Sequence, residues 1–148
     1  MINDSVKLKG ELRITLTNPE GTVTHETVVP NLVVTTGKNF IASRMKDATA
    51  TAMTHMEVGT GTTAAANGDT TLETAISGSR VALTSTTVTD NAVAYVATFP
   101  AGTGTGAVTE AGLFNASSSG TMLCRTVFSV INKGAADTLG ITWTVTVN

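Results

Sequence analysis

The stretch that decides the fold is TEAGLFNASSSGTMLCRTVF, from Thr109 to Phe128. Two apolar runs flank a serine-rich segment at Ser117 to Ser119, and this arrangement predicts a β-hairpin. A turn about those serines makes positions that sum to about 235 or 236 face each other, because paired strands run antiparallel. Glu110 then lies opposite Arg125 or one of its neighbours, so we expect a cross-strand ion pair within a structural hairpin.

Segments outward from this hairpin alternate between apolar and polar residues, which is the pattern of a half-buried strand. From residue 6 to 17 the apolar side chains fall on even positions and the polar ones on odd positions. Asn18-Pro19-Glu20-Gly21 then supplies a turn. In the last strand we expect these side chains to face inward: Leu139, Ile141, Trp143, Val145 and Val147.

The composition favours strands throughout, since Thr makes up about a fifth of the 148 residues and its branched Cβ suits a pleated sheet. We therefore expect an all-β fold: a two-sheet antiparallel sandwich or a jelly-roll-like barrel of about eight strands. The length fits one domain over residues 1–148. Residues 1–17 form either an N-terminal strand of this sheet or an arm that reaches a neighbouring copy.

One short helix is predicted around Gly37 to Ala48, N-capped by Thr36, because apolar side chains recur there at helical spacing. Pro30 is expected to interrupt the strand before it, since proline cannot donate a ladder hydrogen bond. Leu32 to Thr35 is then either a strand resumed after a bulge or an edge strand. A strand from Arg80 to Thr89 and another from Ala92 to Phe99 follow, joined by a tight turn at Asp90-Asn91.

Charge is sparse, at 14% of residues, and the net charge is −2. We expect no direct nucleic-acid binding, because phosphate contacts scale with the number of Lys and Arg. The lone Cys124 excludes an intramolecular disulfide. No apolar run approaches the roughly 20 residues of a membrane span, and residues 1–12 lack the apolar run of a signal peptide. We expect no membrane association. We also expect the protein to be assembled in the cytoplasm.

No motif specifies a reaction, so we assign no catalytic, cofactor-binding or metal-binding residue. The glycine-rich stretches lack the Lys-Ser/Thr pair of a phosphate-binding loop. His25 and His55 are candidates to join Glu26, Glu57 or Asp69 in a metal site or an acid–base pair. The two histidines show no repeated ligand spacing, so surface or interface histidines are expected. Cys124 in an alternating strand is expected to be a packed apolar residue.

Three blocks together resemble small virion structural proteins of tailed bacteriophages. They are NLVVTTGKNFIASRM (Asn31–Met45), MEVGTGTTAAANGDTTL (Met56–Leu72), and the opening hairpin followed by DTLGITWTVTV (Asp137–Val147). The match spans most of the chain from Asn31 onward. The same domain also resembles one in phage tail, baseplate and fibre proteins, but the long fibre segments of a receptor-binding protein are absent here.

This resemblance implies a head decoration, or cement, protein without enzymatic activity. Such a protein sits on the outside of the capsid shell in the virion, commonly as a homotrimer, with the major capsid protein as its partner. A tail, baseplate or fibre component is the alternative. A carbohydrate-binding sandwich is a further one, but the single Trp and single Tyr both fall in apolar phase, which argues against it.

Overall fold

The computed structural model describes residues 5–46 and 50–148, which form mostly strands and one short helix. In chain order the elements are β1 (Leu8–Thr17), β2 (Val23–Val33), α1 (Thr35–Lys46), β3 (His55–Gly59), β4 (Val81–Ala82), β5 (Ser85–Thr89), β6 (Ala92–Phe99), β7 (Gly106–Phe114), β8 (Met122–Lys133) and β9 (Thr138–Val147). The prediction of a mostly-β chain with one helix is confirmed.

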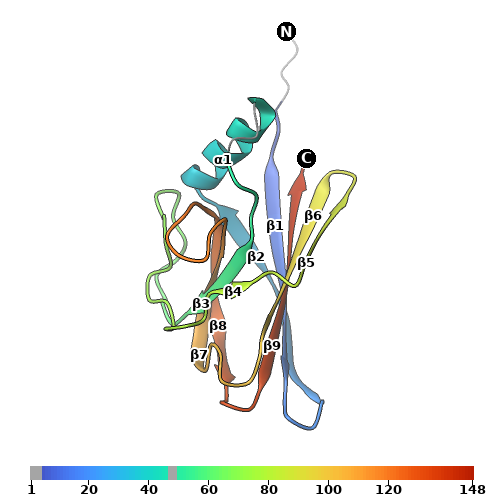
Figure 1. Ribbon diagram of the computed structural model, residues 1–148, viewed down its shortest axis with the longest axis vertical. Helices are drawn as coiled ribbons and strands as arrows, with labels where there is room; N and C mark the ends of the chain where they lie inside the picture. Colours follow the sequence, from blue (N-terminus) through green and yellow to red (C-terminus); the bar gives the residue numbers. More distant parts are fainter. Residues whose placement is uncertain (1–4, 47–49) are drawn as a thin grey trace.

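The nine strands form one antiparallel sheet in the order β4-β3-β7-β8-β2-β1-β9-β6-β5, which curls into a half-barrel (Figure 1). Strand β2 belongs to both halves of the sheet. Its residues up to Asn31 pair with β1, and Leu32 and Val33 pair with β8. The halves therefore face each other around a bend in β2. The finer assignment as a sandwich or jelly roll stays a prediction.

Strand β1 shows how the sequence pattern sets the fold. Leu12, Ile14 and Leu16 are buried on the inner side, as the even-numbered apolar positions predict. The predicted turn follows: the side chain of Asn18 accepts hydrogen bonds from the amides of Glu20 and Thr22. Within the chain β1 pairs with β2 on one side and with β9 on the other. Residues 1–4 of the predicted strand or arm lie outside the described residues.

The predicted interruption at Pro30 is wrong, because β2 runs through it to Val33. Pro30 lies opposite Glu11 at the bend, where β2 leaves β1 for β8. Its carbonyl accepts a hydrogen bond of 2.7 Å from the hydroxyl of Thr126 on β8. The Thr126 side chain thus links β8 to β2 at Pro30, the residue that has no amide hydrogen.

Helix α1 begins at Thr35, two residues before the predicted start, and the predicted end at Ala48 lies outside the described residues. The predicted N-cap is also wrong. The hydroxyl of Thr36 donates 2.9 Å to the carbonyl of Met122 on β8, so it ties the helix to the sheet. Gly37 is the one buried residue of α1, and a Cβ there would clash with the backbone of Leu123. Close contact with β8 positions the helix.

The predicted strand from Arg80 to Thr89 is divided into β4 and β5, which raises the strand count from about eight to nine. The amide of Leu83 donates to the carbonyl of Thr54, before β3, whereas the next amide, of Thr84, donates to Val96 on β6. One run of chain therefore crosses from one half of the sheet to the other. The turn at Asp90-Asn91 is confirmed, with Asp90 at a φ of 52°.

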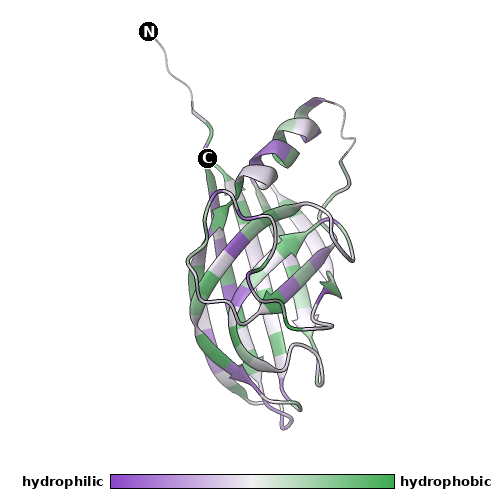
Figure 2. Cartoon of the chain, turned by 90° about the vertical axis from the view of Figure 1, so that its left-hand side faces the viewer, coloured by the Kyte–Doolittle hydropathy of each residue, from purple (hydrophilic) through white to green (hydrophobic). Residues whose placement is uncertain are grey.

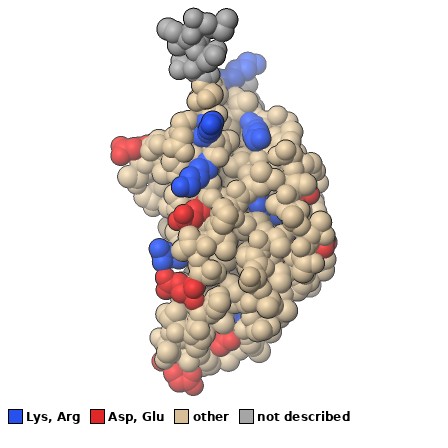
Figure 3. All heavy atoms as spheres, turned by 180° about the vertical axis from the view of Figure 1, so that it is seen from behind, with Lys and Arg blue, Asp and Glu red and all other residues tan. Residues whose placement is uncertain are grey.

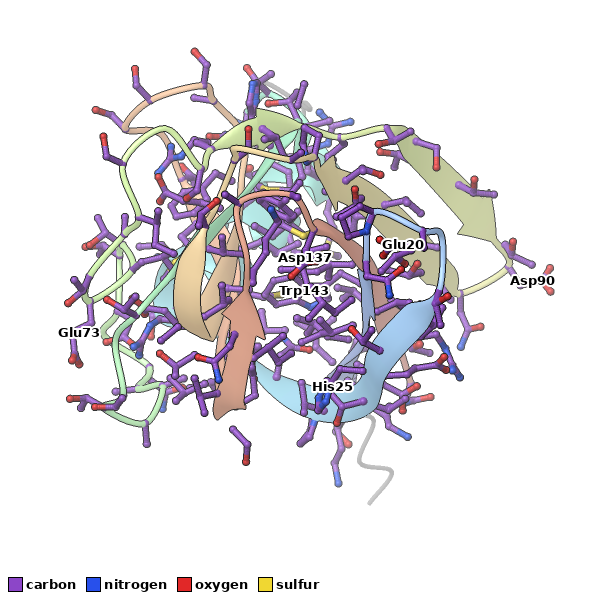
Figure 4. The ribbon with its side chains drawn as sticks, turned by 90° about the horizontal axis from the view of Figure 1, so that it is seen from below. Glu20, His25, Glu73, Asp90, Asp137 and Trp143 are labelled. Carbon is purple, nitrogen blue, oxygen red and sulfur yellow. The ribbon has the colours of Figure 1, made fainter. Side chains whose placement is uncertain are left out.

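The core lies between the two halves of the curled sheet, where Trp143 is fully buried (Figure 4). Apolar and polar bands alternate along the strands (Figure 2). The expected inward positions of β9 are buried, except Val147, which is 42% exposed at the strand end.

Helix α1 has 12 residues. In the described part of the chain no helix reaches the length and apolar character that a bilayer span requires.

Candidate functional site

A buried ion pair joins Glu110 on β7 and Arg125 on β8, as predicted. The Nε and Nη2 atoms of Arg125 donate to Oε2 of Glu110 at 3.0 and 2.8 Å, and the two residues are 0% and 2% exposed. The predicted register is wrong, because Arg125 lies opposite Gly112 and Glu110 opposite Val127. A register shift between Leu113 and Phe114 moves the pairing, so the ion pair is diagonal.

Glu110 holds the segment between β3 and β4 through backbone amides. Its Oε1 accepts from the amides of Gly61 at 3.0 Å and Thr74 at 2.8 Å. Its Oε2 accepts from the amide of Glu73 at 3.0 Å, besides the two donors of Arg125. Five donors thus converge on one buried carboxylate. We call residues 60–80 the clamped loop, because this carboxylate holds it at Gly61, near its start, and at Glu73 and Thr74, past its middle.

Gly59 and Gly61 have no side chain, and the Glu110 carboxylate occupies the space beside them. A Cβ on Gly59 would lie 2.5 Å from Oε1 of Glu110, and a Cβ on Gly61 would lie 2.6 Å from the same atom. No real side chain tolerates such contacts without moving its neighbour. The stretch from Val58 to Thr63 is therefore shaped for close approach to Glu110.

Arg125 also reaches the far side of the clamped loop. Its Nη1 donates to the carboxylate of Asp69 at 2.8 Å, and its Nη2 donates to the carbonyl of Thr63 at 3.0 Å. Burial disfavours the charged guanidinium, but the hydrogen bonds to Glu110 and Asp69 outweigh it, so the pKa of Arg125 is raised above its ordinary value. The arginine stays charged and binds two carboxylates, one on β7 and one in the clamped loop.

This cluster is suited to a structural role, because donors of the protein already engage the carboxylate oxygens of Glu110. A general acid or base needs a lone pair or proton directed at a substrate, and the Glu110 carboxylate already accepts from three amides and the guanidinium. The arrangement favours the structural interpretation of Glu110 and Arg125.

The remaining polar candidates are dispersed over separate elements. His25 is exposed on β2, whereas His55 begins β3, where its Nδ1 lies 2.7 Å from the hydroxyl of Thr54. Glu57 pairs with Arg80 at 3.1 Å. Within residues 5–46 and 50–148, no three His, Cys, Asp or Glu side chains lie close enough together to bind a metal ion.

Two buried groups have shifted proton affinities. Burial raises the pKa of the Cys124 thiol, which disfavours the thiolate that a nucleophile or metal ligand needs. Burial also lowers the pKa of Lys133, which is 2% exposed. The Nζ of Lys133 donates to the carbonyl of Pro100 at 3.1 Å. The sequence predicts a turn at Asn132-Lys133-Gly134, where a lysine ordinarily faces solvent, whereas β8 runs to Lys133 and buries it.

An open apolar groove lies at the end of the molecule where α1 meets β1 and β9. Its volume is about 890 Å³, and Ile41, Met45 and Val147 line it together with Lys7 and Lys38. Met45 is 85% exposed. On the face that Figure 3 shows, most charged side chains lie along one side of the molecule, and a broad area beside them has few. The described surface thus offers uncharged contact areas suited to protein partners.

Comparisons of the chain with known protein families, with curated proteins and with solved structures found no match.

Proposed function

We propose that this chain is a non-enzymatic structural protein of a tailed bacteriophage virion, and that it decorates the outside of the head shell. In this role it contacts the major capsid protein and other copies of itself, as a homotrimer. It is assembled with the virion in the host cytoplasm and binds neither nucleic acid nor membrane directly.

The observation that carries this proposal is where the resembling blocks meet. Gly61 and Asp69 belong to the block Met56–Leu72, and Glu110 and Arg125 belong to the hairpin block. These residues join in the buried cluster that holds the clamped loop on the sheet. The residues behind the resemblance thus form one structural unit.

The surface supports the same role. Its sparse charge lowers the repulsion between crowded copies, and the open groove beside α1 gives an apolar contact area for a capsid subunit. We extend the proposal to the finer architecture: the two halves of the curled sheet act as the two layers of a jelly-roll-like sandwich. Sugar binding is not favoured, since Trp143 is fully buried and Tyr95 packs against the core.

Immunogold labelling of purified virions that contain the chain tests the location. A decoration protein gives label over the whole head, and label at one end of the virion identifies a tail, baseplate or fibre component instead. Purified protein should also bind heads stripped of it up to a fixed ratio to capsid subunits, and should protect them against heat. Binding to tails alone, or no protection at saturation, overturns the decoration role.

A further inference from the structure

Strand β5 is an open edge of the sheet. It pairs with β6 on one side, from Ser85 opposite Val96 to Thr89 opposite Ala92. In the described chain no strand pairs with its other side, and all five of its residues are exposed. Figures 1 and 4 show the β5–β6 hairpin standing out from the body, with Asp90 at its tip.

This edge lacks the features that keep sheet edges from pairing. Natural edge strands carry charged side chains, prolines or bulges that block strand addition. The sequence of β5 is Ser-Thr-Thr-Val-Thr, which has no charge and no proline, and its pairing with β6 is regular over all five residues. Val88 is 70% exposed. Strand β5 is therefore ready to accept another strand.

We propose that β5 pairs antiparallel with β5 of a second copy of this chain, about a two-fold axis at Thr87. Full overlap of five residues requires that centre. It places Ser85 opposite Thr89 of the second copy and Thr86 opposite Val88. Thr–Thr and Thr–Ser pairs across strands are favourable, and an uncharged strand meets its own copy without repulsion.

Two further features select a second β5 as the occupant. The other edge of the sheet is less open. Its edge strand β4 has only two residues, and the clamped loop covers the rest of β3: the amide of Ile76 donates to the carbonyl of Val58 at 3.0 Å. Asp90 follows β5 directly, and in the proposed register it lies beside Thr84 of the second copy, far from the other Asp90. The charge at the hairpin tip therefore does not oppose pairing.

A five-residue strand is about 17 Å long, so the contact is smaller than standard interfaces of about 1,200 to 2,000 Å² and should be weak in dilute solution. Copies held side by side on a shell would pair far more readily. In a trimeric decoration protein, a two-fold contact would link one trimer to the next. The pairing is a property of the isolated chain and holds whether or not the chain decorates a head.

Cysteine cross-linking tests the register directly. Cys124 is fully buried, so Thr87→Cys provides a single exposed thiol. In the proposed pair the two Cα atoms at position 87 lie about 4.5 to 5.5 Å apart, within disulfide range. Ser85→Cys is the matched control, because its two copies are displaced by four residues, about 13 Å along the strands.

Under mild oxidation at about 200 µM protein, Thr87→Cys should form disulfide dimers at least about tenfold faster than Ser85→Cys, since only its thiols meet. Equal rates, or faster linking by Ser85→Cys, overturn the proposal. Failure of both variants to cross-link overturns it as well.

Sedimentation velocity over a concentration series tests the contact without a cross-link. Val88→Lys places two lysines at diagonal positions across the pair, about 7 to 8 Å apart along the strands' common face, and their like charges should weaken dimerisation at least about tenfold. Val23→Lys adds the same charge at a valine that is 52% exposed on β2 and should leave dimerisation unchanged. Self-association that Val88→Lys does not weaken overturns the β5 contact and leaves the decoration role standing. Intact β5 pairing without head binding overturns only that role.

Discussion

The two edges of the sheet are treated in opposite ways. At the β3 edge, the clamped loop supplies hydrogen bonds along the strand: the amide of Thr60 donates to Thr74, and the hydroxyl of Ser79 donates to the carbonyl of Val58 at 2.8 Å. At the β5 edge, five exposed residues face solvent. Figure 4 places Glu73 of the clamped loop and Asp90 beside β5 on opposite sides of the molecule.

The difference shows how the protein uses its few charges. The buried Glu110 and Arg125 serve to keep a long loop on the first edge, where backbone groups would otherwise be exposed for pairing. No charge guards the second edge. A closed edge that depends on a buried ion pair and an open edge that depends on none should respond differently to mutation.

The largest effect is expected for Glu110→Gln. The change leaves the Arg125 guanidinium buried without its main partner, and breaking a buried pair in this way typically costs about 3 to 5 kcal/mol. Urea denaturation measures the loss. The control is Arg13→Ala, since the Arg13–Glu26 pair is 58% and 49% exposed and exposed pairs contribute at most about 1 kcal/mol. Equal losses in both variants would show that Glu110 does not hold the loop.

A smaller loss is expected for Gly61→Ala, because the added methyl group meets Oε1 of Glu110 at 2.6 Å. Overpacking of this kind costs about 1 to 3 kcal/mol. Gly68→Ala is the matched control in the same loop, since no atom lies within 4 Å of its Cβ position, and it should stay within about 0.5 kcal/mol of the parent. The difference in thermal midpoint between the two variants decides the result.

A still smaller, pH-dependent effect is expected for Glu73→Gln. The hydrogen bond from the Thr63 side chain lowers the pKa of Glu73, and the carboxylate is fully exposed. The folded state therefore favours the charged form, so this contribution to stability is present above the ordinary carboxyl pKa and is lost as the pH falls through the lowered one. The variant should be slightly less stable than the parent at pH 7 and equal to it in strong acid. Urea midpoints that differ equally at both pH values contradict this account.

The smallest effect is expected at the open edge. Val88→Thr should change the free energy of unfolding of the monomer by less than about 0.5 kcal/mol, because an exposed side chain away from any cap or core contributes little. Thermal unfolding at low protein concentration measures it. A loss above about 1 kcal/mol would mean that β5 is packed in the isolated chain and that the two edges are alike.

Period-two alternation predicted β1 and β9 well, because each of these strands buries one face and leaves the other at least partly exposed. In β6 this alternation of burial holds only from Ala97 to Phe99. The Glu110–Arg125 pair was predictable for a related reason, since opposite charges in a hairpin tend to meet. The same reasoning failed on the register, because a bulge beside Phe114 leaves no mark in the sequence.

The clamped loop could not have been predicted from its own residues. Its amides are held by a carboxylate more than thirty positions away, and turn signals describe only local bonds. Gly59 and Gly61 were the available signal, since glycines at alternate positions mark a close approach. The Pro30 error has a similar origin: tertiary contact with Thr126 overrides a local rule.

The bend in β2 also has a mechanical consequence. Only Leu32 and Val33 pair with Arg125 and Cys124 on β8, so the backbone ladder that joins the two halves of the sheet is two residue pairs wide. Under a pulling force that separates the halves, this short ladder should rupture before the ten-residue register of β1 with β9. The halves would then be held mainly by core side chains, which resist shear poorly but tolerate small changes in spacing. A subunit with such a built-in compliance could follow a curved surface without breaking its longer ladders.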